Sequence, residues 1–216
     1  MSIENILNNI VKLLRQSDLS FDIKTGDGRI DSKLYEEVVF IEIIRNPKIK
    51  DFLLKNKINF NKTNIRDWYD ISFENNEYFI PINIKVSNLE KNQSDNLNSK
   101  LGIYYALTGK IPHFQNEIKW EDYFKELYEN IQDNNKDYYF IIINKNNSND
   151  IFWTSLKRIS SLVSNGNNLP FQCVWNNNRI HKNRNFNDSK NFILKKLEES
   201  ITKRAKIYFD FKKYFS

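Results

Sequence analysis

Two neighbouring runs of alternating apolar and polar residues, over positions 68–74 and 78–87, form the most informative pattern in the chain. Because side chains alternate along a strand, one face of the second run carries Tyr78, Ile80, Ile82, Ile84 and Val86, and the other carries Phe79, Asn83, Lys85 and Ser87. The Asn-Asn pair between the runs tolerates the positive φ angles of a two-residue turn. The pattern therefore predicts a hairpin in which Asp70 lies opposite Pro81 and on the same face as Asn83 and Lys85.

Longer apolar periodicities predict the remaining elements. Helices are expected over residues 3–15, from 31 or 32 to 45, and over 48–56, 96–108, 120–132, 156–163 and from 188 or 189 to 212. Strands are expected at 138–144, which is apolar throughout like a central strand, and at 151–154 and 171–175. These elements predict an α/β fold, with one domain over residues 1–216 built on a mixed central β-sheet of about five strands flanked by helices.

The second predicted helix is apolar almost all the way round, which is typical of a buried helix. It nevertheless contains Glu36, Glu37 and Glu42. An unpaired buried carboxylate is costly, so at least one of these should lie near a basic side chain or a metal ion. The alternative interpretation is that they lie at the edge of the apolar surface and reach water.

Composition narrows the choice of partner and compartment. The net charge of +6 and the isoelectric point near 9.1 favour a polyanionic partner, although surplus lysine is also common in proteins that bind none. No apolar run approaches the length of a membrane span, and the first residues do not resemble a signal peptide. Cys173 is the only cysteine, which excludes internal disulfides and a cysteine-based zinc site. We therefore expect no membrane partner and a cytoplasmic location.

Asp70, Asn83 and Lys85 are polar residues on one face of a predicted hairpin. A carboxylate and an amide oxygen suit a hard cation, and a neighbouring ammonium can stabilise an anion beside it. Phosphodiester hydrolysis requires that combination of groups. The alternative is an ordinary cross-strand ion pair between Asp70 and Lys85, with Asn83 filling a polar position.

The spacing of these residues resembles the PD-(D/E)xK signature of type II restriction endonucleases. Asp70 occupies the first acidic position, and Asn83-Ile84-Lys85 follows thirteen positions later. Tyr69 stands where the family usually has proline, and Asn83 stands where it usually has an acid, as in the Asn-x-Lys variant. The resemblance implies Mg²⁺ as cofactor, with Asp70 and Asn83 as metal ligands and Lys85 as the catalytic lysine. Asn83 removes one negative charge from the metal site.

The family resemblance extends to the second predicted helix. Lys33-Leu34-Tyr35-Glu36 is similar to an early helix of many such nucleases, which places an acid beside the catalytic strands. Glu36 is the first choice for this catalytic and metal-binding role, and Glu37 is the second. Because the loop after the lysine strand approaches DNA in this family, we expect DNA contacts from Asn88, Lys91, Gln93, Ser94 and Lys100.

A second candidate DNA surface lies near the end of the chain, in the Asn- and Arg-rich segment 176–188. Asparagine can read adenine, and arginine can read guanine or bind phosphate. The candidates are Asn176, Asn178, Arg179, His181, Lys182 and Arg184. A solvated basic loop is the alternative. The order of strand, polar loop and basic terminal helix resembles blunt-cutting restriction enzymes of the EcoRV type.

The resemblance implies a Mg²⁺-dependent type II restriction endonuclease, which cleaves double-stranded DNA at a short palindromic site. A palindromic site implies a homodimer, and a restriction-modification system implies a cognate DNA methyltransferase encoded nearby, which is not a physical partner. The alternatives are another PD-(D/E)xK nuclease, such as a repair enzyme, and a DNA-binding protein without catalysis.

Overall fold

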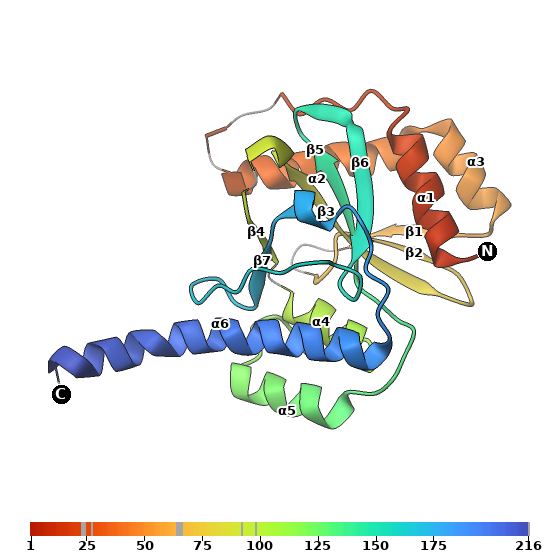
Figure 1. The fold of residues 1–216 in the computed structure, drawn as a ribbon. Helices are drawn as coiled ribbons and strands as arrows, with labels where there is room; N and C mark the ends of the chain where they lie inside the picture. The colour runs from red at the N-terminus through yellow and green to blue at the C-terminus, as the bar shows by residue number, and fades with distance from the viewer. Residues whose placement is uncertain (23–24, 27, 64–66, 92, 98, 216) are drawn as a thin grey trace. The chain divides into compact units, whose positions relative to one another are not determined.

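The computed structural model describes residues 1–22, 25–26, 28–63, 67–91, 93–97 and 99–215. Backbone contacts divide the chain into two compact units, whose elements are labelled in Figure 1. The first, which we call the sheet unit, comprises Met1–Lys91 and Tyr138–Ser155. The second, the helical unit, comprises Asn92–Asp137 and Leu156–Ser216. Within the described residues, no helix combines the length and apolar character that a membrane-spanning segment needs.

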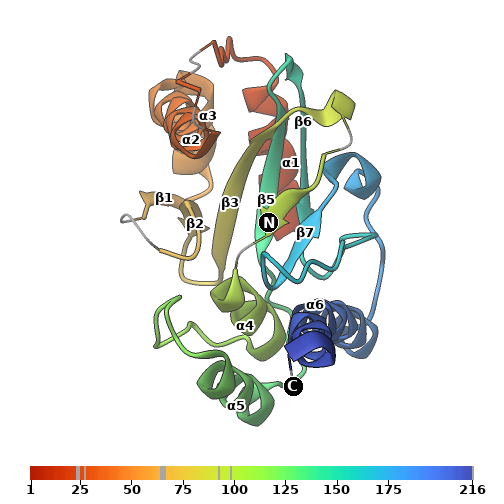
Figure 2. The same ribbon diagram turned by 90° about the vertical axis from the view of Figure 1, so that its left-hand side faces the viewer.

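A mixed five-stranded sheet in the order β1-β2-β3-β5-β6 forms the centre of the sheet unit. The strands are β1 (Asn59–Lys62), β2 (Ile71–Glu74), β3 (Phe79–Ser87), β5 (Tyr139–Asn144) and β6 (Asn147–Ser155). The inner strands β3 and β5, side by side in Figure 2, are parallel, and the other neighbouring pairs are antiparallel. The predicted α/β class, with a mixed five-stranded sheet flanked by helices, is confirmed.

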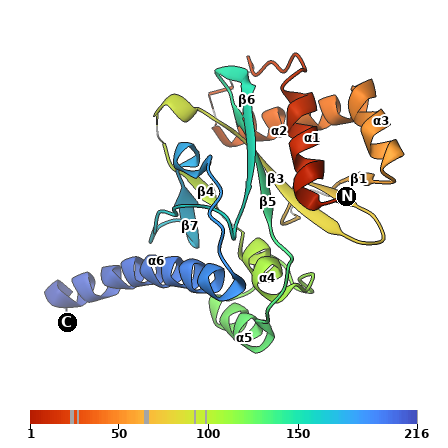
Figure 3. The same ribbon diagram turned by 45° about the vertical axis from the view of Figure 1, so that its right-hand side comes forward.

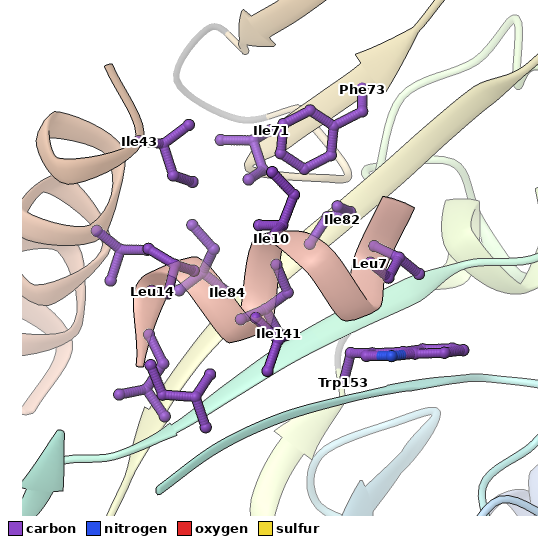
Figure 4. Packing of buried hydrophobic residues seen from close by; sticks show 14 of the residues in the cluster. Leu7, Ile10, Leu14, Ile43, Ile71, Phe73, Ile82, Ile84, Ile141 and Trp153 are labelled. Atoms are coloured by element: carbon purple, nitrogen blue, oxygen red, sulfur yellow. The ribbon is translucent and has the colours of Figure 1, made fainter. Parts of the chain in front are cut away.

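Three helices pack on one face of this sheet: α1 (Ile3–Leu14), α2 (Gly28–Arg45) and α3 (Pro47–Lys55). Ser2 begins α1 by accepting a hydrogen bond from the backbone N–H of Asn5 at 3.2 Å, as expected for an N-cap residue. The apolar face of α1 packs on β3, β5 and β6, as Figure 4 shows for Leu7, Ile10, Ile141 and Trp153. This buried cluster fixes β2 and β3, on which the candidate site residues lie.

The predicted hairpin is present, but its register differs by two residues from the prediction. Ile71 lies opposite Ile82 and Ser72 opposite Pro81, whereas the two-residue turn placed Asp70 opposite Pro81. The prediction was wrong because the Asn75 side chain accepts hydrogen bonds from the backbone N–H groups two and three residues later, at 2.8 and 3.0 Å, which closes a four-residue loop. A shift of two residues keeps every side chain on its predicted face, since only an odd shift exchanges the faces.

Helix α2 is less buried than its apolar composition predicted. Tyr35, Val39 and Ile43 lie in the core, but Ile41 and Ile44 are 36% and 40% exposed. Only one side of α2 packs against the other elements of the sheet unit. The apolar residues on its opposite side therefore stay at the surface. The expected burial of this helix therefore holds for one side of α2 and not for the other.

The described residues of the helical unit form a two-stranded antiparallel sheet, three α-helices and the 3-10 helix Trp175–Asn178 (Figure 3). Its elements are β4 (Asp95–Leu97), β7 (Phe171–Cys173), α4 (Lys100–Thr108), α5 (Trp120–Asn130) and α6 (Phe186–Phe215). The predicted helix over 96–108 starts later because its first residues form β4. The predicted strand at 171–175 pairs with β4 and does not join the five-stranded sheet.

Residues 156–163 form a turn followed by irregular backbone and a β-bridge from Val163 to Gln172, where a helix was predicted. Leu156, Ile159 and Leu162 are buried, which produced the helix-like spacing. The backbone groups of this segment bond outside it: the Ser161 N–H donates to the Asn178 side chain at 2.9 Å. Such partners replace the backbone bonds that a helix would supply.

Candidate active site

Glu36, Asp70 and Lys85 come from three separate segments of the sheet unit and act on one another electrostatically. Glu36 lies on α2, Asp70 immediately precedes β2, and Lys85 lies within β3. The packing of α2 against β3 and the pairing of β2 with β3 bring the three side chains together. The structure thus groups three of the four residues that the sequence resemblance assigned to catalysis.

Asp70 is held at the point where β2 separates from β3. Its backbone N–H donates to the Ile82 carbonyl at 2.9 Å, and its Oδ2 accepts from the Ile84 N–H at 2.6 Å. Because β2 begins only at Ile71, the Ile84 N–H bonds to this carboxylate in place of a β2 partner. Burial raises the pKa of Asp70, while the Lys85 ammonium and the Ile84 N–H act to lower it.

Glu36 is the more strongly perturbed of the two carboxyl groups. Burial, followed by the neighbouring charge of Asp70, raises its pKa to about 7, although Lys85 and the Ser32 hydroxyl act in the opposite direction. The Ser32 hydroxyl donates to Oε1 at 3.2 Å. Two carboxyl groups that repel each other in a partly buried site are what a bound cation would stabilise.

The other acids of α2 have different partners. Glu37 forms an ion pair with Lys62 at the protein surface, and Glu42 accepts a hydrogen bond from the Asn46 side chain at 2.7 Å. In contrast, burial and the charge of Asp70 act on Glu36 and raise its pKa. The structure therefore favours Glu36 over Glu37, the choice that the sequence left open.

A cavity of about 530 Å³ opens at Asp70 and Glu36. It is lined by Lys33, Glu36, Glu37, Phe40, Lys62, Thr63, Asp67, Tyr69, Asp70, Ile71 and Ile84. Asn83 and Lys85 are not among these residues, and Lys85 reaches the site through its charge on both carboxylates. Lys62 lines this cavity but was not predicted from the sequence as a site residue. The four residues of β1 are mostly polar and show no recognisable strand pattern.

Asn83 lies beside Asp70 in the hairpin. The pairing of Ile71 with Ile82, continued by one position, sets Asp70 opposite Asn83, closer than the diagonal neighbour that was predicted. Its side-chain Oδ1 is buried and has no hydrogen-bond partner among the described residues. An unpaired buried amide oxygen is costly and rare, so it calls for a partner such as a cation or a water molecule.

The donor set fits a hard divalent cation such as Mg²⁺. Two carboxylates, Asp70 and Glu36, and the Asn83 amide oxygen are all oxygen ligands. The described part of the chain contains no group of three or more His, Cys, Asp or Glu side chains that could hold a metal. The third oxygen ligand would therefore be the amide of Asn83.

Comparison with protein-family models and with curated proteins finds no match for this chain. The functional interpretation therefore depends on the residues themselves.

The candidate DNA-binding residues near the hairpin are distributed over both units. Asn88 belongs to the sheet unit and accepts a hydrogen bond from the Glu90 N–H at 3.1 Å. Gln93 is exposed and Ser94 is half-buried. Lys100 donates to the Ile118 carbonyl at 2.6 Å and lies over the Trp120 ring. The side chain of Lys91 lies outside the described part of the chain.

Asn178 and Arg184 have structural roles in the helical unit. Asn178 is fully buried, and its amide nitrogen donates to the carbonyls of Ser161 and Val174 at 3.1 and 2.9 Å. Arg184 donates to the carbonyls of Lys157 and Ile159 at 3.2 and 2.7 Å. These bonds stabilise the irregular segment 156–163, so they give Asn178 and Arg184 a structural role that the sequence did not predict.

The remaining candidates of the 176–184 segment lie at the surface. Arg179 and Lys182 are exposed, and Asn176 and His181 are half-buried. The Asn176 side chain accepts a hydrogen bond from Arg179 Nε at 2.8 Å. This pair presents a guanidinium and an amide together, which suits contact with a base edge or a phosphate.

We expect Arg179→Ala and Arg184→Ala to have different effects. Arg184→Ala should lower the free energy of unfolding by about 1–3 kcal/mol, since the carbonyls of Lys157 and Ile159 both lose the Arg184 donor. Arg179→Ala should leave stability unchanged and weaken DNA binding, by about 1–3 kcal/mol at a specific site if Arg179 contacts a base. Urea denaturation and binding to specific and nonspecific duplexes measure the two effects. Equal destabilisation by both changes would contradict the assignment, and equal losses on both duplexes would make Arg179 a phosphate contact.

Proposed function

We propose that the protein is a Mg²⁺-dependent type II restriction endonuclease that cleaves double-stranded DNA at a short palindromic site. The observation that carries the proposal is the grouping of Glu36, Asp70 and Lys85 beside the unpaired Asn83 oxygen. Asp70, Asn83 and Lys85 could also lie on an ordinary solvated hairpin, but such a hairpin gives no reason for a partly buried helical glutamate to lie beside them.

Each residue of the site has a separate role in this reaction. Asp70, Glu36 and Asn83 would hold Mg²⁺ through their oxygen atoms, and the bound ion would supply Lewis-acid stabilisation of the phosphate. Asp70 is oriented by the Ile84 N–H, which fixes one of its carboxylate oxygens. Lys85 would stabilise the negative charge that develops on the phosphate and help to position the attacking water. The exposed basic residues would bind the DNA backbone.

Incubation of the purified protein with plasmid DNA and Mg²⁺ tests the proposal. We expect discrete fragments, since a restriction enzyme cuts at defined sites. A smear would indicate a nonspecific nuclease of the same superfamily. Uncut DNA at every Mg²⁺ and Mn²⁺ concentration would contradict the proposal.

The second candidate function is DNA binding without catalysis. The residue that favours it is Asn83, because an amide replaces the second acid of the usual signature. The same plasmid experiment separates the two, since a binding protein would retard the DNA in a gel and leave it intact. In either case double-stranded DNA is the proposed partner.

The comparison of Glu36→Gln with Glu37→Gln tests which acid of α2 serves the site. The two residues are neighbours on one helix and both line the cavity. We expect Glu36→Gln to slow cleavage at least about tenfold at limiting Mg²⁺, because the site loses one of its two carboxylates. Glu37→Gln, which removes only a surface ion pair, should stay within about twofold of the wild type. Cleavage rates over a Mg²⁺ titration measure both, and the reverse order would assign the role to Glu37.

A further inference from the structure

A second cavity lies within the helical unit. It has a volume of about 430 Å³ and is lined by the first residues of α4 and α5, by the segment 167–170 and by Arg204 of α6. Figures 1 and 3 show these three helices gathered in one part of the unit. None of the described residues that line it belongs to the candidate active site. Small-molecule sites commonly have volumes of about 300–1,000 Å³, so this cavity has the size of a ligand site.

Two cationic side chains line this cavity, and backbone carbonyls hold each of them in place. Lys100 donates from Nζ to the Ile118 carbonyl at 2.6 Å, and its ammonium lies 4.9 Å from the centroid of the Trp120 ring. Arg204 donates from Nε and Nη2 to two carbonyls of the facing loop at 2.8 and 2.9 Å. An ammonium has three N–H donors and a guanidinium has five, so both groups keep donors that these bonds do not use. Two anchored cations with spare donors suit an anionic group such as phosphate.

The electrostatics of the cavity favour an anion as well. None of its described lining residues is acidic. Burial lowers the pKa of Lys100, and the charge of Glu117 acts in the opposite direction. An anion in the cavity would therefore offset the cost of burying this ammonium.

The loop that carries Asn167 and Asn168 is fixed against α6. A Cβ atom at Gly166 would lie 2.8 Å from the Arg204 backbone nitrogen, so this close approach requires glycine. The Asn165 side chain accepts hydrogen bonds from the backbone N–H groups of Asn167 and Asn168 at 2.8 and 3.0 Å. Both of these side chains are exposed and line the cavity. Their amides are therefore held at the cavity wall, where a ligand can reach them.

The rest of the cavity wall is mainly apolar. Trp120, Leu169 and Pro170 supply apolar surface, and Asn116 adds a third amide. A planar ring packs well on such a surface, and asparagine amides can bond to the polar edge of a nucleobase. A phosphate ion alone would use only the cations, whereas a base joined to a phosphate would use the whole set.

We propose that this cavity binds a nucleotide, that is, a purine or pyrimidine ring that carries a phosphate. Lys100 and Arg204 bind the phosphate, and the ring packs on the apolar wall with its polar edge toward the asparagine amides. The nucleotide is either free or part of a single strand of nucleic acid, since the chemistry of recognition is the same for both. The proposal goes beyond the proposed function, because it requires no cleavage and none of the residues assigned to catalysis.

Calorimetric titration of the full chain with adenosine monophosphate tests the proposal. A chelator is present, so that no divalent ion occupies the candidate active site. We expect one molecule to bind per chain. Adenosine and inorganic phosphate should each bind at least about tenfold more weakly, because each makes only one part of the contacts.

Arg204→Gln should raise the dissociation constant of adenosine monophosphate at least about tenfold, since a charged donor to the phosphate is lost. Lys203→Gln is the matched control. Lys203 precedes Arg204 on α6 and holds the same loop through the Ser164 carbonyl at 3.0 Å, but it does not line the cavity. This control should change the constant by no more than about twofold. Lys100→Gln repeats the test from α4, and circular dichroism should show that all three variants are folded.

Titration with a single-stranded oligodeoxyadenylate identifies the source of the nucleotide. If the strand displaces adenosine monophosphate and Arg204→Gln weakens it, the site takes a nucleotide of a strand. If only adenosine monophosphate binds, the site takes a free nucleotide. The proposal is overturned if neither ligand binds, if inorganic phosphate binds as tightly as the nucleotide, or if Arg204→Gln and Lys203→Gln lose affinity equally. None of these results bears on the nuclease proposal, because no cleavage is measured.

Discussion

Lys85→Ala should abolish DNA cleavage and leave the affinity for DNA within about tenfold of the wild type. The ammonium of Lys85 acts on both Asp70 and Glu36, so it lies where negative charge would develop on a bound phosphate. Removal of one such group costs about 10²–10³ in rate in comparable sites. The affinity should change little, because one charge among many phosphate contacts contributes modestly to binding. Single-turnover cleavage and a gel-shift titration in Ca²⁺ measure the two quantities.

Lys62→Ala is the matched control for this experiment. Lys62 lines the same cavity, but its ammonium is paired with Glu37 at the surface. We expect Lys62→Ala to cleave at a rate within about threefold of the wild type, since surface ion pairs contribute little. If Lys85→Ala cuts as fast as the wild type, or if both variants lose activity equally, the catalytic assignment of Lys85 is wrong.

The parts of the fold that depend on local periodicity could be predicted from the sequence. The apolar face of α1 and the apolar strand β5 were identified because each pattern repeats over many residues. The prediction that Asp70, Asn83 and Lys85 share one face of the hairpin also agrees with the register. A register shift of an even number of residues leaves each side chain on the same face. The register of the hairpin could not be predicted in this way. It depends on a hydrogen bond to the Asn75 side chain, and no short sequence pattern indicates that bond.

The parts that depend on distant contacts could not be predicted. The buried spacing of Leu156, Ile159 and Leu162 looks helical, but the backbone there is held by side chains such as Asn178 and Arg184. The same two residues looked like DNA contacts, because a polar composition does not reveal which amides and guanidinium groups point inward. The choice between Glu36 and Glu37 likewise required the packing of α2 on the sheet.

Asn83→Asp should lower the Mg²⁺ concentration needed for half-maximal cleavage at least about tenfold. Two unit charges 4 Å apart interact by about 4 kcal/mol at an effective dielectric constant near 20, and a factor of ten requires only about 1.4 kcal/mol. The wild-type site has two carboxylates, Asp70 and Glu36, so we expect a Mg²⁺ requirement in the millimolar range and occupancy by one ion. The added carboxylate has nearly the same shape as the amide. Its effect should therefore come from charge.

The measurement is a Mg²⁺ titration of cleavage, accompanied by calorimetric titration of the free protein with Mn²⁺. Asn88→Asp is the matched control, because it adds the same charge after the end of β3 and keeps the side-chain oxygen that accepts from the Glu90 N–H. We expect no change in the Mg²⁺ requirement for this control. A lower requirement in Asn83→Asp alone, whether or not the maximal rate survives, places Asn83 beside the ion. An unchanged titration would place it outside the coordination sphere, and its unpaired Oδ1 would then need another partner, such as a buried water molecule.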